Sequence, residues 1–416
     1  MKKNILVKGP VLSRSGYGYQ SRFALKALQT REDIFNIYIQ NIPWGKTSWI
    51  YRDDEFRRWI DDRILKTIEH AQGGGFFDMS LQITIPNEWE KIAPVNIGYT
   101  AGIESSKVAP LWLQKGNEMD NIIVVSNHAK YTYENTSVKA QDNNTGKVVD
   151  YKLKTNIDVV NYSTVECDKE PIPNFELTTD FNFLNVSQWG PRKNIENTIR
   201  WWVEEFKDEP RAGLIIKANY VNDSLMDYKH LKGTMRDFLA QYPDRKCKVY
   251  ILHGDMSREQ MSWLYSHEKV KANINIAHAE GFGLPIFEAA YHGMPNITIG
   301  WSGQMDYLRH NNKDYFSSVR YTIGPIQDQA VWNGVLEKDS LWAYADEDSY
   351  KQKCRDMFER HDHWKSLAIE LKEKSLDVDF TDDKLYSKFV DHVAGDAINF
   401  EDEIDKLFSE VSGLGE

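Results

Sequence analysis

Cysteine is scarce in this sequence, and the few copies are scattered. The 416 residues contain three cysteines, Cys167, Cys247 and Cys354, with no spacing typical of a metal site. This scarcity excludes a disulfide scaffold and suits a reducing compartment. No apolar run reaches 18 residues, and the segment after Lys2 and Lys3 lacks an apolar stretch long enough for a signal peptide. We therefore expect a cytoplasmic protein without a membrane span.

Basic residues are fewer than acidic ones, with 51 Lys and Arg against 62 Asp and Glu. The net charge of −11 argues against a protein that binds nucleic acid by charge alone. Residues 1–170 nevertheless hold 22 Lys and Arg against 21 Asp and Glu, so the acidic excess lies in the rest of the chain. The first half would not repel an anionic partner, although ordinary variation in surface charge explains the asymmetry equally well.

Apolar segments of strand length alternate with amphipathic helical segments along most of the chain. Strands are expected at residues 79–85 and 121–127 in the first half, and at residues 181–189 and 212–219 in the second. Strands that alternate with helices are typical of a parallel sheet covered by helices on both faces. The sequence therefore predicts the α/β class.

A change of composition divides the chain into two such series. Pro171 and Pro173 lie in the expected linker between them. We predict two doubly wound, Rossmann-like domains that face each other across a cleft, at residues 1–172 and residues 173–385. Residues 386–416 are predicted to form a helical tail that packs back on the first domain.

The stretch from Asn275 to Asn296, NIAHAEGFGLPIFEAAYHGMPN, combines a glycine turn with two carboxylates. It predicts a strand, a tight turn and a short helix with Pro285 in its first turn. This arrangement places Glu280 at the strand end and Glu288 in the helix, at the edge where open α/β sheets bind ligands. The helix N-terminus can bind a phosphate, and ionised carboxylates can accept hydrogen bonds from hydroxyl groups.

A basic pair follows an earlier strand of the second half. The segment QWGPRKN places Arg192 and Lys193 where the chain turns into a helix expected to begin near Asn194. The helix dipole, the free N–H groups and the two formal charges all favour a phosphate at this point. A solvated pair of loop residues is the alternative.

These motifs resemble the donor-binding half of family 4 retaining glycosyltransferases, which have the GT-B fold. The segment from Lys248 to Leu308 carries that family's pattern of Glu, seven residues and Glu around a Gly-Phe-Gly-Leu-Pro turn, with the two glutamates at Glu280 and Glu288. The segment SQWGPRKN resembles the same family's Arg-Lys segment, and SRSGYGYQSR resembles its first glycine-rich loop.

The resemblance implies an enzyme that transfers a sugar from a nucleotide diphosphate donor, most often a UDP-sugar, with retention of configuration and without a metal or other cofactor. Glu280 would contact the transferred sugar on its reacting face, and Glu288 would bind the ribose. Arg192 and Lys193 would neutralise the departing diphosphate. The family's retention of configuration implies attack on the face from which the diphosphate departs, so no enzyme nucleophile is required. The remaining donor-binding residues would be Gly281, Phe282, Gly283, Leu284 and, across the cleft, Gly16 and Gly18.

The acceptor side is marked by single polar residues. The stretch from residue 96 to residue 130 resembles the family's two strands joined by a helix, and it places four such residues near the ligand edge: Thr100, Glu104, Ser126 and His128. Any of them could orient or deprotonate a hydroxyl group. Single residues of these types are more often structural. A glycan, a protein, a lipid-linked sugar or a modified DNA base would fit the donor half equally well as acceptor.

A modified base in DNA is one of these possible acceptors. Residues 8–28 also resemble phage-encoded glycosyltransferases, some of which modify hydroxymethylated cytosine. A lysine-rich loop would then form the DNA footprint, with Lys139, Lys147, Lys152 and Lys154 around Tyr151. The target base would have to be flipped out of the duplex.

Three other classes of protein fit the sequence to different degrees. A dinucleotide-binding oxidoreductase would need G-x-G-x-x-G, but Gly18 is followed by Tyr-Gln-Ser. A metal-dependent transferase would need Asp-x-Asp at a strand end, whereas the two such triplets, residues 346–348 and residues 377–379, lie in the polar, helical last part of the chain. A non-catalytic protein that binds a nucleotide-sugar or a carbohydrate stays open as the alternative of another class.

Overall fold

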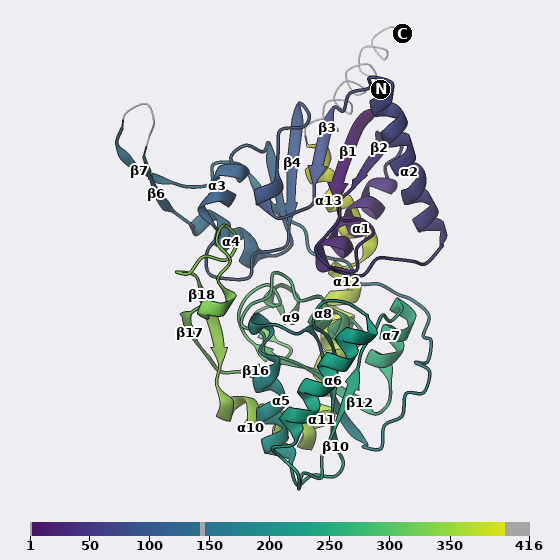
Figure 1. Ribbon diagram of the computed structural model, residues 1–416, viewed down its shortest axis with the longest axis vertical. Helices are drawn as coiled ribbons and strands as arrows, with labels where there is room; N and C mark the ends of the chain where they lie inside the picture. The colour runs from purple at the N-terminus through teal and green to yellow at the C-terminus, as the bar shows by residue number, and fades with distance from the viewer. Residues whose placement is uncertain (1, 142–145, 396–416) are drawn as a thin grey trace, which may run out of the picture.

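The computed structural model describes residues 2–141 and 146–395, so residues 396–416 of the predicted tail lie outside the described part. Within that part the chain forms two α/β domains, one above the other in Figure 1. Each is built on a six-stranded sheet in which all neighbouring strands are parallel. The prediction of two doubly wound domains is confirmed.

The N-terminal sheet has the strand order β2-β1-β3-β4-β5-β8. Its strands are β1 (Lys3–Gly9), β2 (Phe35–Asn41), β3 (Met79–Gln82), β4 (Val95–Thr100), β5 (Asn121–Val124) and β8 (Ile157–Val159). The helices beside it are α1 (Gly16–Gln29), α2 (Glu55–Gln72), α3 (Pro110–Gly116) and α4 (Asn127–Asn135), with a short 3-10 turn η1 (Pro86–Glu88). Consecutive side chains of β1, from Ile5 to Val7, are buried, because a parallel sheet is covered on both faces.

The C-terminal sheet has the strand order β11-β10-β9-β12-β13-β16. Its strands are β9 (Phe181–Gln188), β10 (Ala212–Asn219), β11 (Lys248–Leu252), β12 (Val270–Asn275), β13 (Asn296–Ile299) and β16 (Ser317–Val319). The helical elements around it are η2 (Pro191–Lys193), α5 (Ile195–Phe206), α6 (Leu225–Leu239), α7 (Arg258–Ser266), α8 (Leu284–Tyr291), α9 (Met305–Leu308), α10 (Glu347–Glu359), α11 (His361–Leu371), η4 (Lys372–Leu376) and α12 (Asp377–Asp379).

The chain returns to the N-terminal domain near its end. The chain passes between the two domains twice, and the two passages meet where the Thr164 N–H donates to the Phe380 carbonyl oxygen over 2.7 Å. Helix α13 (Asp382–Ala394) then lies among the elements of the upper domain in Figure 1, packed on α1. The Phe389 ring lies 5.7 Å from Phe23 and 5.0 Å from Tyr99. This helix begins before residue 386, where the tail was predicted to start.

Two antiparallel strand pairs extend beyond the sheets. The hairpin of β6 (Val138–Gln141) and β7 (Val148–Tyr151) projects from the upper domain, away from the rest of the molecule in Figure 1. The pair β17 (Tyr321–Pro325) and β18 (Leu341–Ala345) belongs to the lower domain. A third, short pair joins β14 (Arg309–His310) to β15 (Lys313–Asp314).

We call residues 326–340, between β17 and β18, the arm, and this segment reaches across to the N-terminal domain. It contains the 3-10 turn η3 (Asp328–Ala330). The Gly334 carbonyl oxygen accepts hydrogen bonds from the Asn87 side-chain amide over 2.8 Å and from the Trp112 indole over 3.0 Å. At the end of the arm, the Trp342 indole donates to the Glu104 carbonyl oxygen over 2.9 Å. The arm therefore ties the two domains together on one side of the gap between them.

Among the helices that the structure describes, none combines the length and the apolarity needed to cross a lipid bilayer.

Candidate active site

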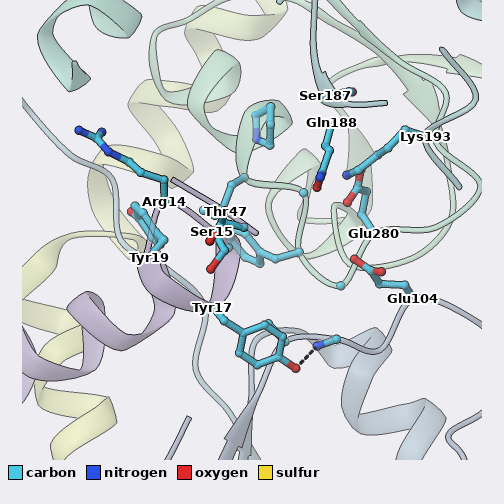
Figure 2. Close-up of a pocket in the computed structure, with 18 of the residues that line it drawn as sticks. Arg14, Ser15, Tyr17, Tyr19, Thr47, Glu104, Ser187, Gln188, Lys193 and Glu280 are labelled. Atoms are coloured by element: carbon cyan, nitrogen blue, oxygen red, sulfur yellow. Dashed lines mark hydrogen bonds and ion pairs between the residues drawn. The ribbon is translucent and has the colours of Figure 1, made fainter. Parts of the chain in front are cut away.

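A cleft of about 1120 Å³ lies between the two domains. Its walls come from the carboxyl ends of both sheets and the helix N-termini that follow them, which is where doubly wound sheets bind ligands. Figure 2 shows Lys193, Glu280 and Glu104 close together on one side, with Ser15, Tyr17 and Thr47 facing them from the N-terminal domain. The cleft therefore contains the centre of the predicted site.

The turn that carries Glu280 is held by its own backbone conformation and by hydrogen bonds to Ser302 and Gly303. Gly283 has a φ of +86° and precedes α8. Pro285 fits the first turn of this helix, because N–H groups there have no partner within the helix and proline lacks an N–H. The Glu280 N–H donates to the Ser302 hydroxyl over 3.0 Å, and its carbonyl oxygen accepts from the Gly303 N–H over 2.9 Å. The Glu280 side chain is thus held at a defined place, with 4% of the residue exposed.

The basic pair reaches the same place from η2. The Arg192 carbonyl oxygen accepts a hydrogen bond from the His278 N–H over 2.8 Å, which fastens η2 to the segment that leads into the turn. Asn194 adopts the left-handed conformation (φ 52°) and starts α5. The sequence predicted this change from strand to helix near Asn194, and the structure confirms it.

Arg192, Lys193, Glu104 and Glu280 form one charged cluster. Lys193 Nζ lies 2.5 Å from Glu280 Oε1, and Arg192 Nη1 lies 3.1 Å from Glu280 Oε2. Arg192 Nη2 also lies 2.8 Å from the carboxylate of Glu104, which comes from the other domain. Two cations and two carboxylates thus balance each other at the centre of the cleft.

The cluster shifts the pKa values of its members in different directions. Burial by itself would raise the pKa of Glu280, but Lys193 and Arg192 outweigh burial and hold it below its ordinary value. Burial raises the pKa of Glu104, and the two cations offset only part of that effect. Glu280 is therefore an ionised, acceptor-only group, whereas the Glu104 carboxylate is more basic than an ordinary glutamate.

Glu288 lines the cleft from α8, beyond the turn. Its carboxylate accepts a hydrogen bond from the Tyr265 hydroxyl over 3.0 Å. Burial raises the pKa of Glu288, and Tyr265 and Arg258 oppose this only in part. The two glutamates of the motif lie on the same wall in different surroundings, since one faces two cations and the other a phenol.

The glycines and turn residues of the predicted donor site divide into two groups. Gly16, Gly281, Phe282, Gly283 and Leu284 line the cleft, and Gly18 does not. A Cβ added to Gly18 would overlap the Ser13 carbonyl oxygen, so that glycine is needed for packing. A Cβ on Gly281 would overlap the carbonyl oxygen of Ala101 in the other domain, so this glycine lets the domains touch.

Of the four acceptor-side candidates, only Glu104 lines the cleft. The Thr100 hydroxyl lies 2.7 Å from the Tyr17 hydroxyl, behind the cleft wall. The Ser126 hydroxyl caps α4 and donates to the Gly281 carbonyl oxygen over 2.6 Å. His128 lies against Trp301, and burial lowers its pKa to about 4. The structure therefore brings Glu104, but not the other three, to the charged cluster.

Several cleft residues were not singled out from the sequence. Lys217, at the end of β10, lines the cleft and donates to the Gly254 carbonyl oxygen over 2.7 Å. Its place at a strand end was a usable signal, because ligand-edge residues follow strands. Tyr17, Trp44 and Trp332 also line the cleft. Tyr17 stands between Gly16 and Gly18 in the glycine-rich motif but was not itself predicted to bind a ligand. No sequence pattern marks Trp44 or Trp332, which come from loops in different parts of the chain.

Within residues 2–141 and 146–395, no three His, Cys, Asp or Glu side chains lie together in a way that could hold a metal ion. Metal-independent chemistry stays a prediction.

The architecture is that of GT-B proteins. No protein-family model and no curated protein matches the sequence. Among solved structures, sucrose-phosphate synthase from Thermosynechococcus elongatus is similar, with a TM-score of 0.59 and 12% identity over 98% of this chain and 100% of that one. HepE from Anabaena, in complex with UDP and glucose, has a TM-score of 0.58 and 12% identity over 94% of this chain and 100% of that one.

A third similar structure is trehalose-6-phosphate from E. coli bound with UDP-2-fluoro-glucose, with a TM-score of 0.57 and 10% identity over 94% of this chain and 99% of that one. The chain spans only 60% of the longer pneumococcal O-GlcNAc transferase GtfA, at a TM-score of 0.48. At these identities the likeness establishes the GT-B fold, and the chemistry has to be argued from the site.

Proposed function

We propose that this protein is a retaining glycosyltransferase that moves a sugar from a UDP-sugar to a hydroxyl group of an acceptor, without a metal ion. The observation that carries the proposal is the placement of Arg192 and Lys193 against Glu280 at the ligand edge of the second domain, inside a cleft between two Rossmann-like domains. Similar GT-B structures hold UDP with glucose, or a UDP-sugar analogue, which supports uridine as the base.

The cluster suits a sugar diphosphate in particular. Arg192 and Lys193 offer charge-assisted hydrogen bonds to the two phosphates. As the bond between the sugar C1 and the diphosphate oxygen breaks, negative charge grows on that oxygen, and pre-placed cations stabilise it by a few kcal/mol per donor. No covalent enzyme intermediate is needed, because the acceptor oxygen bonds to C1 on the face from which the diphosphate leaves.

The two glutamates take the two ends of the donor in this proposal. Glu280 accepts hydrogen bonds from the sugar hydroxyls once the diphosphate has taken over part of its contact with Lys193. Glu288, beside Tyr265, accepts from the ribose hydroxyls. Glu104 is the acceptor-side candidate that lines the cleft, and its raised pKa suits a group that orients the acceptor hydroxyl and takes its proton.

The proposal is tested by calorimetric titration of the protein with UDP, GDP and ADP, with and without EDTA. We expect micromolar binding of UDP that EDTA does not change, and loss of that binding in Glu288→Ala. Glu90→Ala is the matched control, because Glu90 is an exposed glutamate outside the cleft lining. The absence of binding to all three nucleotides would refute the transferase interpretation of this cleft.

If no nucleotide bound in that titration but a free carbohydrate did, the result would instead favour a non-catalytic binding protein. DNA as the acceptor has less support. None of the loop lysines of the predicted footprint lines the cleft, and Lys139 is paired with Asp150 at 2.8 Å.

A further inference from the structure

The arm presents a tryptophan that has no evident packing role. Trp332 is 62% exposed, yet it lines the cleft. An exposed indole is a costly group to leave in water, since it offers a large apolar face. Trp332 is therefore a candidate for contact with a ligand.

The segment that holds Trp332 is well defined. The Trp332 N–H donates to the Leu336 carbonyl oxygen over 3.0 Å, and the Leu336 N–H donates back over 2.7 Å. Between them, Gly334 has a φ of +79° and its carbonyl oxygen is bonded to Asn87 and Trp112 of the other domain. An aromatic side chain on a rigid turn loses little entropy on binding, because its backbone is already fixed.

The arm lies beside the charged cluster. Its 3-10 turn η3 packs against η2, which carries Arg192 and Lys193. Where the arm ends, Trp342 donates to the backbone of Glu104. On the N-terminal side, Ile85 and Glu88 flank Asn87, the residue bonded to the arm, and both line the cleft. This wall, formed by the arm and η1, therefore adjoins the residue that we assign to the acceptor hydroxyl.

The charge of this wall disfavours a polyanion. The arm carries Asp328, Glu337 and Asp339 against one lysine, Lys338, which pairs with Asp328 at 3.4 Å. Lys107 forms an ion pair with Asp339. Nucleic acid needs cations for its phosphates, and the lysines of this wall are already engaged with carboxylates.

We propose that the wall binds a saccharide acceptor, with one face of a sugar ring stacked on Trp332 and its hydroxyls bonded to Gln329 and Glu88. A pyranose has a face of C–H groups that packs on an indole and a rim of hydroxyls that need polar partners, and this wall offers both. The inference rests on the proposed function, because it names the acceptor class of the same cleft.

The test is saturation-transfer-difference NMR of the UDP-loaded protein with maltose, cellobiose, lactose and methyl α-glucoside. We expect transfer to the ring protons of at least one saccharide. Trp332→Ala should raise its Kd by about tenfold or more, and Trp332→Phe should regain most of the affinity. Trp49→Ala is the control, because Trp49 is 40% exposed and outside the cleft lining. Thermal unfolding confirms that each variant is folded.

Three outcomes would overturn the inference. One is the absence of transfer to any of the four saccharides, and another is an unchanged Kd in Trp332→Ala. The third is tighter binding of a duplex oligonucleotide that contains 5-hydroxymethylcytosine than of any saccharide. UDP calorimetry distinguishes a failure of the proposed function from a failure of the proposed acceptor, since a protein that binds UDP but fails these tests contradicts only the acceptor class.

Discussion

Removing the charge of Glu280 should lower the stability of the free protein and raise its affinity for UDP. In the free protein this carboxylate lies between Lys193 and Arg192, the two groups assigned to the diphosphate. Glu280→Gln keeps the size of the side chain but replaces one of its two acceptor oxygens with a donor NH2 group and leaves Lys193 without a carboxylate. The substitution therefore separates the internal pairing of the cations from their pairing with a ligand.

The magnitudes follow from the geometry of the cluster. Breaking a buried ion pair by removing one partner costs about 3–5 kcal/mol of stability. Two cations and two carboxylates are electrically neutral together, and the variant gains one net positive charge. A unit charge roughly 5 Å from a phosphate contributes about 3 kcal/mol at an effective dielectric constant of ~20. Water and salt in the cleft reduce this to about half, which is roughly a tenfold lower Kd for UDP.

Calorimetry at low and high salt measures the UDP affinity, and thermal unfolding with and without UDP measures the stability. We expect a lower Tm for the free variant, a larger rise in Tm with UDP than in the unmodified protein, and a gain in affinity that shrinks as salt is added. Sugar transfer should be lost, because Gln cannot act as an ionised acceptor for the sugar hydroxyls. Glu90→Gln should change none of these quantities.

A folded Glu280→Gln variant that binds UDP no more tightly than the unmodified protein at low salt would refute the reasoning. That result would mean that the diphosphate does not contact Arg192 and Lys193, and the donor would have to be placed elsewhere in the cleft.

Three further predictions concern Glu288 and the glycines of the cleft. Because burial raises the pKa of Glu288, UDP affinity should fall as the pH is lowered from 7 toward that pKa. Glu288→Gln should remove this part of the pH dependence. If calorimetry gave the same pH profile for the variant and the unmodified protein, that result would contradict the prediction. The stability of the free protein should move the other way, rising as Glu288 takes up its proton, since the folded state binds that proton at a higher pH than the unfolded chain does. Gly281→Ala should cost about 1–3 kcal/mol and open the cleft, because the added methyl group overlaps the carbonyl oxygen of Ala101, whereas Gly16→Ala has free space around it and should leave Tm unchanged. Thermal unfolding and small-angle scattering check this pair, and equal effects of the two substitutions would count against it.

Local patterns in the sequence carried the prediction of the fold. Apolar strand segments that alternate with helical ones need two buried faces, so they indicated a parallel sheet in each half. The turn around Gly283 and the helix after Asn194 were predicted for the same reason, since their backbone conformations depend on neighbouring residues. Arg192, Lys193, Glu280 and Glu288 all follow strands, and parallel strands of one sheet end at one edge.

The sequence was less informative about residues whose surroundings come from the other domain. Ser126 looks like a ligand-binding residue in a motif, but its hydroxyl donates to the backbone of Gly281 across the domain interface. Thr100 is engaged with Tyr17 in a similar way. Such contacts join residues far apart in the chain, and no spacing in a single sequence specifies them.

Local sequence patterns were enough to predict the two parallel sheets and the edge of the second sheet where the charged residues gather, because strand length, helix periodicity and turn chemistry are local properties. The contact of Glu104 with Arg192 from the opposite domain, and the position of Trp332 in the cleft, could be seen only in the folded chain. Both depend on how the two domains close on each other, and that closure is set by contacts spread over the whole interface.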